Sequence, residues 1–153
     1  MKKIFVILLC ASLFITLVGC NKVEENQNNI DFKYKIALVC DYSDTQEEGI
    51  GVEIFNSIES YYNTSKNPAK KYHPQSNKSQ HIISSINTAI NDSSNVITVI
   101  GNEYGNAVSS IAAEYPHITF VIIGMSDAIA LHNNVYCCNL DTDYLEFFKS
   151  ILK

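Results

Sequence analysis

Four carboxylates in one short stretch are the first candidates for chemistry in this chain of 153 residues. Asp41, Asp44, Glu47 and Glu48 lie between a short apolar run and the start of a helical pattern. Clustered carboxylates suit a divalent cation or acid–base catalysis. Acidic residues at the start of a helix also interact favourably with its dipole without any ligand. The pattern favours this capping role for Glu47 and Glu48, and a cation site is the alternative.

Cysteine and histidine add little further chemistry. The histidines show no metal-ligand spacing, and no CxxC, HExxH, Gly-x-Ser-x-Gly or P-loop motif occurs. Cys137 and Cys138 are adjacent in a predicted strand and therefore point to opposite faces, while Cys40 lies in a strand that is not their neighbour. We expect these three cysteines to be buried thiols. No metal, cofactor or catalytic group is predicted, and the chain is not expected to be an enzyme.

Composition and charge exclude nucleic acid as a partner. The chain has a formal net charge of −5 and no arginine, and apart from Lys70-Lys71 its lysines are scattered. The chain therefore lacks the clustered basic side chains that a surface binding a phosphate backbone needs. The hydrophobic content of 46% is enough for the core of one ordinary domain.

The first twenty residues have the features of an export signal. Lys2 and Lys3 precede an apolar run, and Leu17-Val18-Gly19-Cys20 resembles a bacterial lipobox. We predict a signal peptide over residues 1–19, acylation of Cys20, and a flexible lipidated tether over residues 20–33. The domain would then be held at the extracytoplasmic face of the cell membrane. An uncleaved anchor and a plain secretory leader are the alternatives.

Residues 34–153 alternate between strand and helix patterns. The β-branched runs around residues 96–100 and 118–123 suit buried parallel strands, and the segment between them carries a helical apolar stripe that ends at Pro116. Further strands are predicted at 34–41, 69–73 and 135–139, and helices at 50–61, 79–92, 108–115 and 142–152. This alternation predicts a three-layer αβα sandwich with a parallel sheet of strand order 2-1-3-4-5.

The strand–helix–strand unit over residues 95–124 places a candidate ligand site. Gly101 and Gly105 bracket the turn at the carboxyl end of its first strand, where open α/β sheets bind their ligands. Asp41 ends the first strand of the sheet in the same way. The pattern alone therefore favours a ligand-binding lobe.

Several phrases together resemble a known family. The lipobox, the strand IALVCD, the phrase AAEYPHITFVIIG and the phrase NNVYCCNLD are similar to the amino-terminal lobe of the basic membrane protein family. Members are substrate-binding lipoproteins of ABC transporters, similar to the nucleoside-binding ones. The resemblance covers residues 34–148. It implies a periplasmic-binding-protein-like lobe that captures a nucleoside-like small molecule and delivers it to a membrane permease.

The resemblance also implies individual site residues. The strand-end aspartate of the family corresponds to Asp41, which would contact the sugar or base. The aromatic residue that stacks on the base is missing at the matching positions, residues 47–51, and Tyr42 or Tyr104 could supply a ring instead. Asn106 stands where the family has an aspartate, which keeps hydrogen bonding but removes the charge. The alternative is that Tyr42, Tyr104 and Asn106 are ordinary loop residues.

The family also has a second lobe of about the same size, for which residues 34–153 leave no room. We expect either a fragmentary gene product or a stand-alone lobe that pairs with itself, as a homodimer, or with another polypeptide. In the last predicted helix, Leu145, Phe148 and Leu152 are expected to face the sheet. Tyr144, Phe147 and Phe148 are candidates for the exposed apolar surface that a missing partner would leave.

The sequence thus predicts a lipid-anchored, non-catalytic α/β lobe that binds a small molecule. An envelope interaction or sensory α/β module without such a ligand is the alternative from another class. A hydrolase with a metal ion at Asp41 and Asp44 is a further alternative.

Overall fold

The computed structural model describes residues 33–40, 49–62, 69–125 and 132–153, which belong to one compact unit, Phe32–Lys153. The predicted signal peptide and Cys20, the predicted site of lipidation, lie outside the described residues. The acidic loop with Asp41 and Tyr42 also lies outside them. The predictions made for these segments therefore stay predictions.

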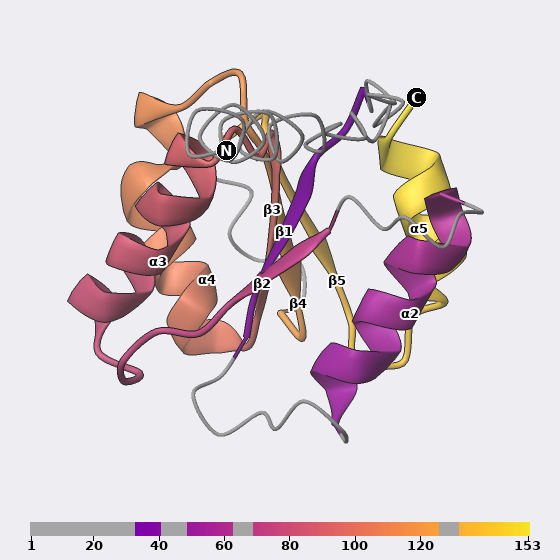
Figure 1. Ribbon diagram of the computed structural model, residues 1–153, viewed down its shortest axis with the longest axis horizontal. Coiled ribbons are helices and arrows are strands. Elements are labelled where there is room, and N and C mark those ends of the chain that lie inside the picture. Colours follow the sequence, from indigo (N-terminus) through magenta and orange to yellow (C-terminus); the bar gives the residue numbers. More distant parts are fainter. Residues whose placement is uncertain (1–32, 41–48, 63–68, 126–131) are drawn as a thin grey trace, which may run out of the picture. The chain divides into compact units, whose positions relative to one another are not determined.

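Five parallel strands form one sheet in the order β2-β1-β3-β4-β5 (Figure 1). The strands are β1 (Ile36–Val39), β2 (Lys70–Tyr72), β3 (Val96–Ile100), β4 (Thr119–Ile123) and β5 (Val135–Cys138). Strands β1, β3 and β4 are buried along almost their whole length, as expected for β-branched runs that are covered on both faces. The predicted fold class and strand order are confirmed.

Helices cover both faces of this sheet. They are α2 (Ile50–Tyr62), α3 (Ser79–Asn91), α4 (Asn102–Ile111), which continues as the 3₁₀ helix η2 (Ala112–Glu114), and α5 (Tyr144–Ile151). Figure 1 shows α3 and α4 on one face and α2 and α5 on the other. The arrangement is the predicted three-layer sandwich.

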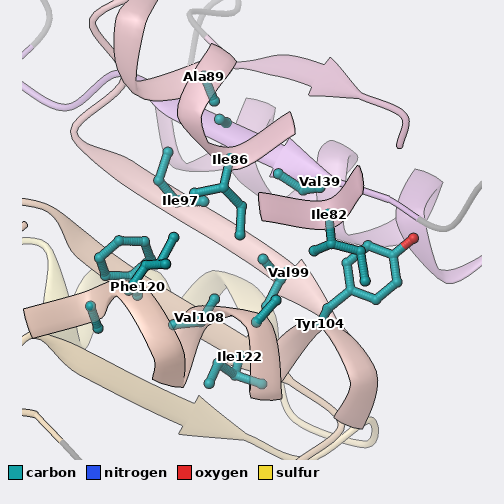
Figure 2. Close-up of a cluster of buried hydrophobic side chains, with 14 of the residues drawn as sticks. Val39, Ile82, Ile86, Ala89, Ile97, Val99, Tyr104, Val108, Phe120 and Ile122 are labelled. Atoms are coloured by element: carbon teal, nitrogen blue, oxygen red, sulfur yellow. The ribbon is translucent and has the colours of Figure 1, made fainter. Parts of the chain in front are cut away.

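Side chains that alternate along the strands build two separate cores. Neighbouring residues of β1 show this, because Ala37 packs in the core beneath α3 and α4 and Leu38 packs in the core beneath α2 and α5. In the first core, Ile82 and Ile86 of α3 and Val108 of α4 point toward the sheet (Figure 2). The apolar spacing of each helix therefore decides which of its faces meets the sheet.

The sheet-facing side of α5 differs from the prediction. Tyr144 and Phe148 are 2% and 0% exposed, whereas Leu145 is only half-buried. The helix begins at Tyr144, where the Asp143 side chain accepts a hydrogen bond from the backbone N–H of Glu146 at 3.1 Å. This start puts Tyr144 on the same face as Phe148. The predicted sheet-facing positions of Phe148 and Leu152 are therefore confirmed, whereas the prediction of Leu145 as a core residue and of Tyr144 and Phe148 as exposed apolar surface is wrong.

The turn after α4 is held by one side chain from a distant segment. The Asn134 amide donates to the backbone carbonyls of Ala112, Tyr115 and Ile118 at 3.2, 3.0 and 3.0 Å. These carbonyls lie where the chain leaves α4 and turns toward β4, and those of Ala112 and Tyr115 also accept backbone N–H groups within the turn, at 3.2 and 3.0 Å. The predicted helix up to Tyr115 instead ends in this 3₁₀ turn.

Candidate functional site

The carboxyl ends of the strands form the edge where the sequence predicts a ligand site. Strand order reverses between β1 and β3, since β2 lies on one side of β1 and the later strands lie on the other. A crevice outside the carboxyl ends at such a switch point is the usual ligand position in open α/β sheets. The backbone N–H groups of Cys40, Gly101 and Gly124 each donate to the last carbonyl of a neighbouring strand, at 3.0, 2.8 and 2.8 Å. These bonds extend the pairing of β1 with β2, of β3 with β4 and of β4 with β5 to the carboxyl ends of the strands.

Two of the predicted site residues come directly after the end of β1 in the sequence. Asp41 and Tyr42 come after Cys40, whose backbone is fixed by its hydrogen bond at the end of β1. Both residues lie in the segment 41–48, outside the described residues. Their contact with a ligand remains a prediction.

Tyr104 is placed differently from an exposed stacking ring. Its side chain is 3% exposed and belongs to the core beneath α3 and α4 (Figure 2). The hydroxyl donates to the carbonyl of Cys40 and approaches Oδ1 of Asn77, both at 3.2 Å. Tyr104 therefore offers its hydroxyl to the edge and fixes the end of β1 against α4, while the ring fills the core.

Asn106 is exposed on the second turn of α4. Residues two apart on a helix point in different directions, so the structure does not bring the Asn106 and Tyr104 side chains together. Asn102, one turn earlier, is exposed on the same side of the helix. The sequence analysis missed Asn102, although its spacing of four residues from Asn106 could have indicated the shared face.

The first turn of α4 has backbone N–H groups near the edge that the helix itself does not use. Gly101 precedes the helix with φ of 91° and provides no side-chain cap. Glu103 lies in this first turn, where a negative charge interacts favourably with the helix dipole. The start of α4 thus presents amide side chains, backbone N–H groups and one carboxylate beside the carboxyl end of β3.

Described residues also line cavities away from the switch point. A cavity of about 300 Å³ lies between the end of β2 and α3 and is lined by Tyr72, His73, Gln75, His81, Ser84, Ser85 and Thr88. Another of about 350 Å³ lies beside the end of α4 and is lined by Ala112, Ala113, Pro116, His132, Asn133 and Asn134. His81 Nδ1 lies 2.8 Å from Ser76 Oγ, which fixes one imidazole ring of the first cavity.

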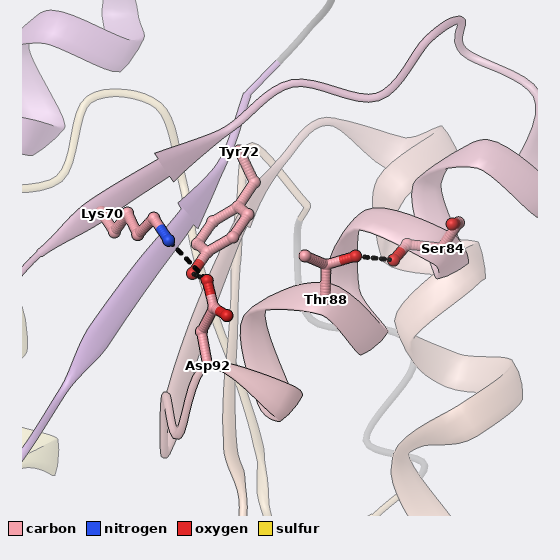
Figure 3. A network of polar contacts seen from close by, with 5 residues as sticks. All are labelled: Lys70, Tyr72, Ser84, Thr88 and Asp92. Carbon is pink, nitrogen blue, oxygen red and sulfur yellow. Dashed lines mark hydrogen bonds and ion pairs between the residues drawn. The ribbon is translucent and has the colours of Figure 1, made fainter.

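A polar network joins β2 to the end of α3 (Figure 3). The Asp92 carboxylate accepts hydrogen bonds from Lys70 Nζ at 2.5 Å and from the Tyr72 hydroxyl at 2.8 Å. The hydrogen bond from Lys70, followed by that from Tyr72, lowers the pKa of Asp92. Burial, followed by the hydrogen bond to Asp92, raises the pKa of Tyr72. Because these three side chains bond to one another, we interpret the network as a structural link between β2 and the end of α3.

Other kinds of site find no support in the part of the chain that is described. Among those residues, no three His, Cys, Asp or Glu side chains are grouped so that they could hold a metal ion. None of the described helices has the length and apolar character needed to cross a membrane. Burial raises the pKa of the Cys138 thiol to about 11, so this cysteine is not a thiolate nucleophile at neutral pH.

The chain was compared with curated proteins and with solved structures. No curated protein matches the chain. The crystal structure of a "putative lipoprotein" fragment from Peptoclostridium difficile 630 is similar, with a TM-score of 0.58 over 77% of this chain and 93% of that chain. At 18% identity, this likeness shows the fold alone.

The family comparison covers most of the sequence. The model that describes PnrA-like ABC transporter substrate-binding proteins matches residues 20–145. This range includes the whole sheet and the carboxyl ends of its strands. The chain therefore belongs to the basic membrane protein (Bmp) family of PnrA-like ABC transporter substrate-binding proteins.

Proposed function

We propose that this chain captures a nucleoside-like small molecule at the carboxyl edge of its sheet, around the ends of β1 and β3. The observation that carries the proposal is the switch point itself, where α4 begins directly after the carboxyl end of β3, the strand beside β1. Family membership supports a substrate-binding role, and the nucleoside as ligand is our own addition.

The groups at this edge suit a neutral ligand that carries hydroxyl and heterocyclic groups. The Asn106 amide both donates and accepts hydrogen bonds, as do hydroxyls and the edges of nucleobases. Asp41 would accept hydrogen bonds from hydroxyls, and Tyr42 would contribute a ring or hydroxyl. The net charge of −5 and the absence of arginine disfavour phosphorylated ligands. A nucleoside therefore fits the edge better than a nucleotide.

The remaining parts of the proposal follow from the family. The captured molecule would be passed to the permease of an ABC transporter without chemical change, so the chain would not act as an enzyme. An acyl anchor at Cys20 would hold it at the extracytoplasmic face of the cell membrane. Small-molecule sites enclose most of their ligand, and the described residues provide one wall. A homodimer or another polypeptide remains an expectation for the second wall.

The test is calorimetric titration of the full chain, in detergent, with purine and pyrimidine nucleosides. We expect saturable binding of at least one nucleoside and an affinity about tenfold lower for Asn106→Ala, because one ligand hydrogen bond is lost. Asn133→Ala is the matched control, since Asn133 is an exposed asparagine just before β5, at the opposite end of the sheet from the proposed site. If no nucleoside binds, or if both variants bind as the wild type does, the proposed site is wrong.

A further inference from the structure

Two glycines leave the ends of two neighbouring strands without side chains at the edge of the sheet. Gly101 and Gly124 directly follow β3 and β4, and both have positive φ, of 91° and 84°. The Gly101 N–H donates to the Ile123 carbonyl at 2.8 Å, so the two glycines lie on adjacent, hydrogen-bonded strand ends. Among the described residues, a Cβ at Gly101 would meet no atom within 4 Å, which shows open space over this position. A ligand can approach the backbone closely at such a glycine.

Leu140 borders this glycine surface on the side of β5. A Cβ atom at Gly124 would lie 2.9 Å from Leu140 Cδ2 and 3.2 Å from Cγ, so the Leu140 side chain lies over the end of β4. It is nevertheless 55% exposed, the larger exposure of the two large hydrophobic side chains identified as exposed in the described segments. The isobutyl group therefore presents an apolar surface at the edge where the ligand is expected.

The Leu140 backbone is held independently of its side chain. Its carbonyl accepts a hydrogen bond at 2.6 Å from the hydroxyl of Tyr144, which is itself buried in the core beneath α2 and α5. The adjacent Gly124 N–H donates to the Cys138 carbonyl at 2.8 Å. The fold thus fixes the position of the Leu140 backbone, although the exposed Leu140 side chain belongs to neither core.

We infer that Leu140 is the apolar contact for the planar ring of the ligand, which lies over Gly101 with its apolar surface against the leucine that covers Gly124. The inference rests on the proposed function and deepens it, because it assigns the ring recognition that Tyr104 cannot provide from the core. Parallel strands are about 4.8 Å apart, so Leu140 stands about two strand spacings from Gly101. The ligand class is a nucleoside or a similar molecule with a flat heterocycle.

The inference is tested by titrating the full chain in detergent with the nucleoside that the wild type binds. Leu140→Asn removes the apolar contact at nearly constant size, and covering the exposed half of a leucine corresponds to an affinity about fivefold weaker for this variant. Leu140→Phe offers a ring for stacking and is expected to bind about threefold more tightly. Tyr136→Asn is the matched control, since Tyr136 is 38% exposed but lies within β5, two residues before the carboxyl end of the strand.

The outcomes of this titration distinguish a failure of the Leu140 contact from a failure of the proposed function. Weaker binding by Leu140→Asn and tighter binding by Leu140→Phe, with Tyr136→Asn unchanged, supports the inference. If the wild type binds a nucleoside and Leu140→Phe does not bind more tightly, Leu140 does not contact the ring, even where Leu140→Asn fails to fold. If the wild type binds no nucleoside, the proposed function fails and this inference fails with it.

Discussion

At the scale of single residues, Thr98 is out of place among its apolar neighbours. It lies in the middle of β3, paired in register with Leu38 and Val121, and is fully buried. Its Oγ1 atom has no hydrogen-bond partner in the described part of the structure. A buried hydroxyl without a partner costs about 1–3 kcal/mol of stability. Thr98 is therefore a place where the fold can be improved without touching the candidate site.

Replacing this hydroxyl by a methyl group gives the first prediction. Thr98→Val is expected to raise the free energy of unfolding by about 1–2 kcal/mol, because it removes the unpaired hydroxyl and keeps the shape. Urea denaturation of both proteins measures the difference. Thr98→Ser is the control, since it keeps the hydroxyl, loses a methyl group and should lose about 1 kcal/mol. A Thr98→Val protein that is no more stable than the wild type would mean that the hydroxyl has a partner.

At the scale of elements, the short edge strand β2 depends on its tie to α3. Lys70 and Tyr72 are two of its three residues, and both donate hydrogen bonds to Asp92, the residue that caps the end of α3. The Lys70 ammonium group also lies 5.1 Å from the centre of the Tyr72 ring. The network therefore connects the sheet edge to the helix that packs beneath it.

This tie predicts a dependence of stability on pH. The pKa of Asp92 is lower in the folded protein, so its ionised form stabilises the fold above the unfolded pKa, and this contribution is lost as the pH falls through the folded pKa. Below about pH 4 the wild type is therefore expected to lose stability more steeply than Asp92→Asn. Denaturation at a series of pH values measures both slopes.

Asp141→Asn controls for the loss of one exposed carboxylate, because Asp141 lies outside the network. It should keep the acid-side slope of the wild type. Equal slopes for the wild type and Asp92→Asn would show that the ion pair does not hold β2 to α3.

Elements were the part of the structure that the sequence predicted best, and long-range contacts were the part it predicted least. The strands and helices follow from local apolar spacing, and strand order follows from right-handed crossovers between parallel strands. Asn134 bonds to carbonyls 16 to 22 residues away, and no local pattern shows such a partner. Tyr144 is buried in place of its neighbour Leu145. In the first turn of α5 the buried face is therefore displaced by one residue from the predicted face, and apolar spacing alone did not distinguish the two.

At the scale of the whole molecule, the sequence predicted which turns lie at the carboxyl edge of the sheet but not how the side chains there are placed. The glycine turns after β3 and β4 mark that edge directly in the sequence. Tyr104 is as suitable for stacking as any tyrosine until the fold shows it in the core. Leu140 reads in the sequence as one more apolar residue at the end of a strand, and only its exposure and its contact with Gly124 set it apart.

The most direct test of ligand capture at this edge is amide chemical-shift mapping of the full, isotope-labelled chain during titration with the nucleoside that binds. The largest shifts are expected at the backbone N–H groups of Gly101, Asn106 and Gly124, which stand at the strand ends and on the exposed side of α4. Residues that line the cavity beside α3, such as His81 and Thr88, should barely move. Shifts centred on that cavity, or none at all at a saturating concentration, would contradict the account.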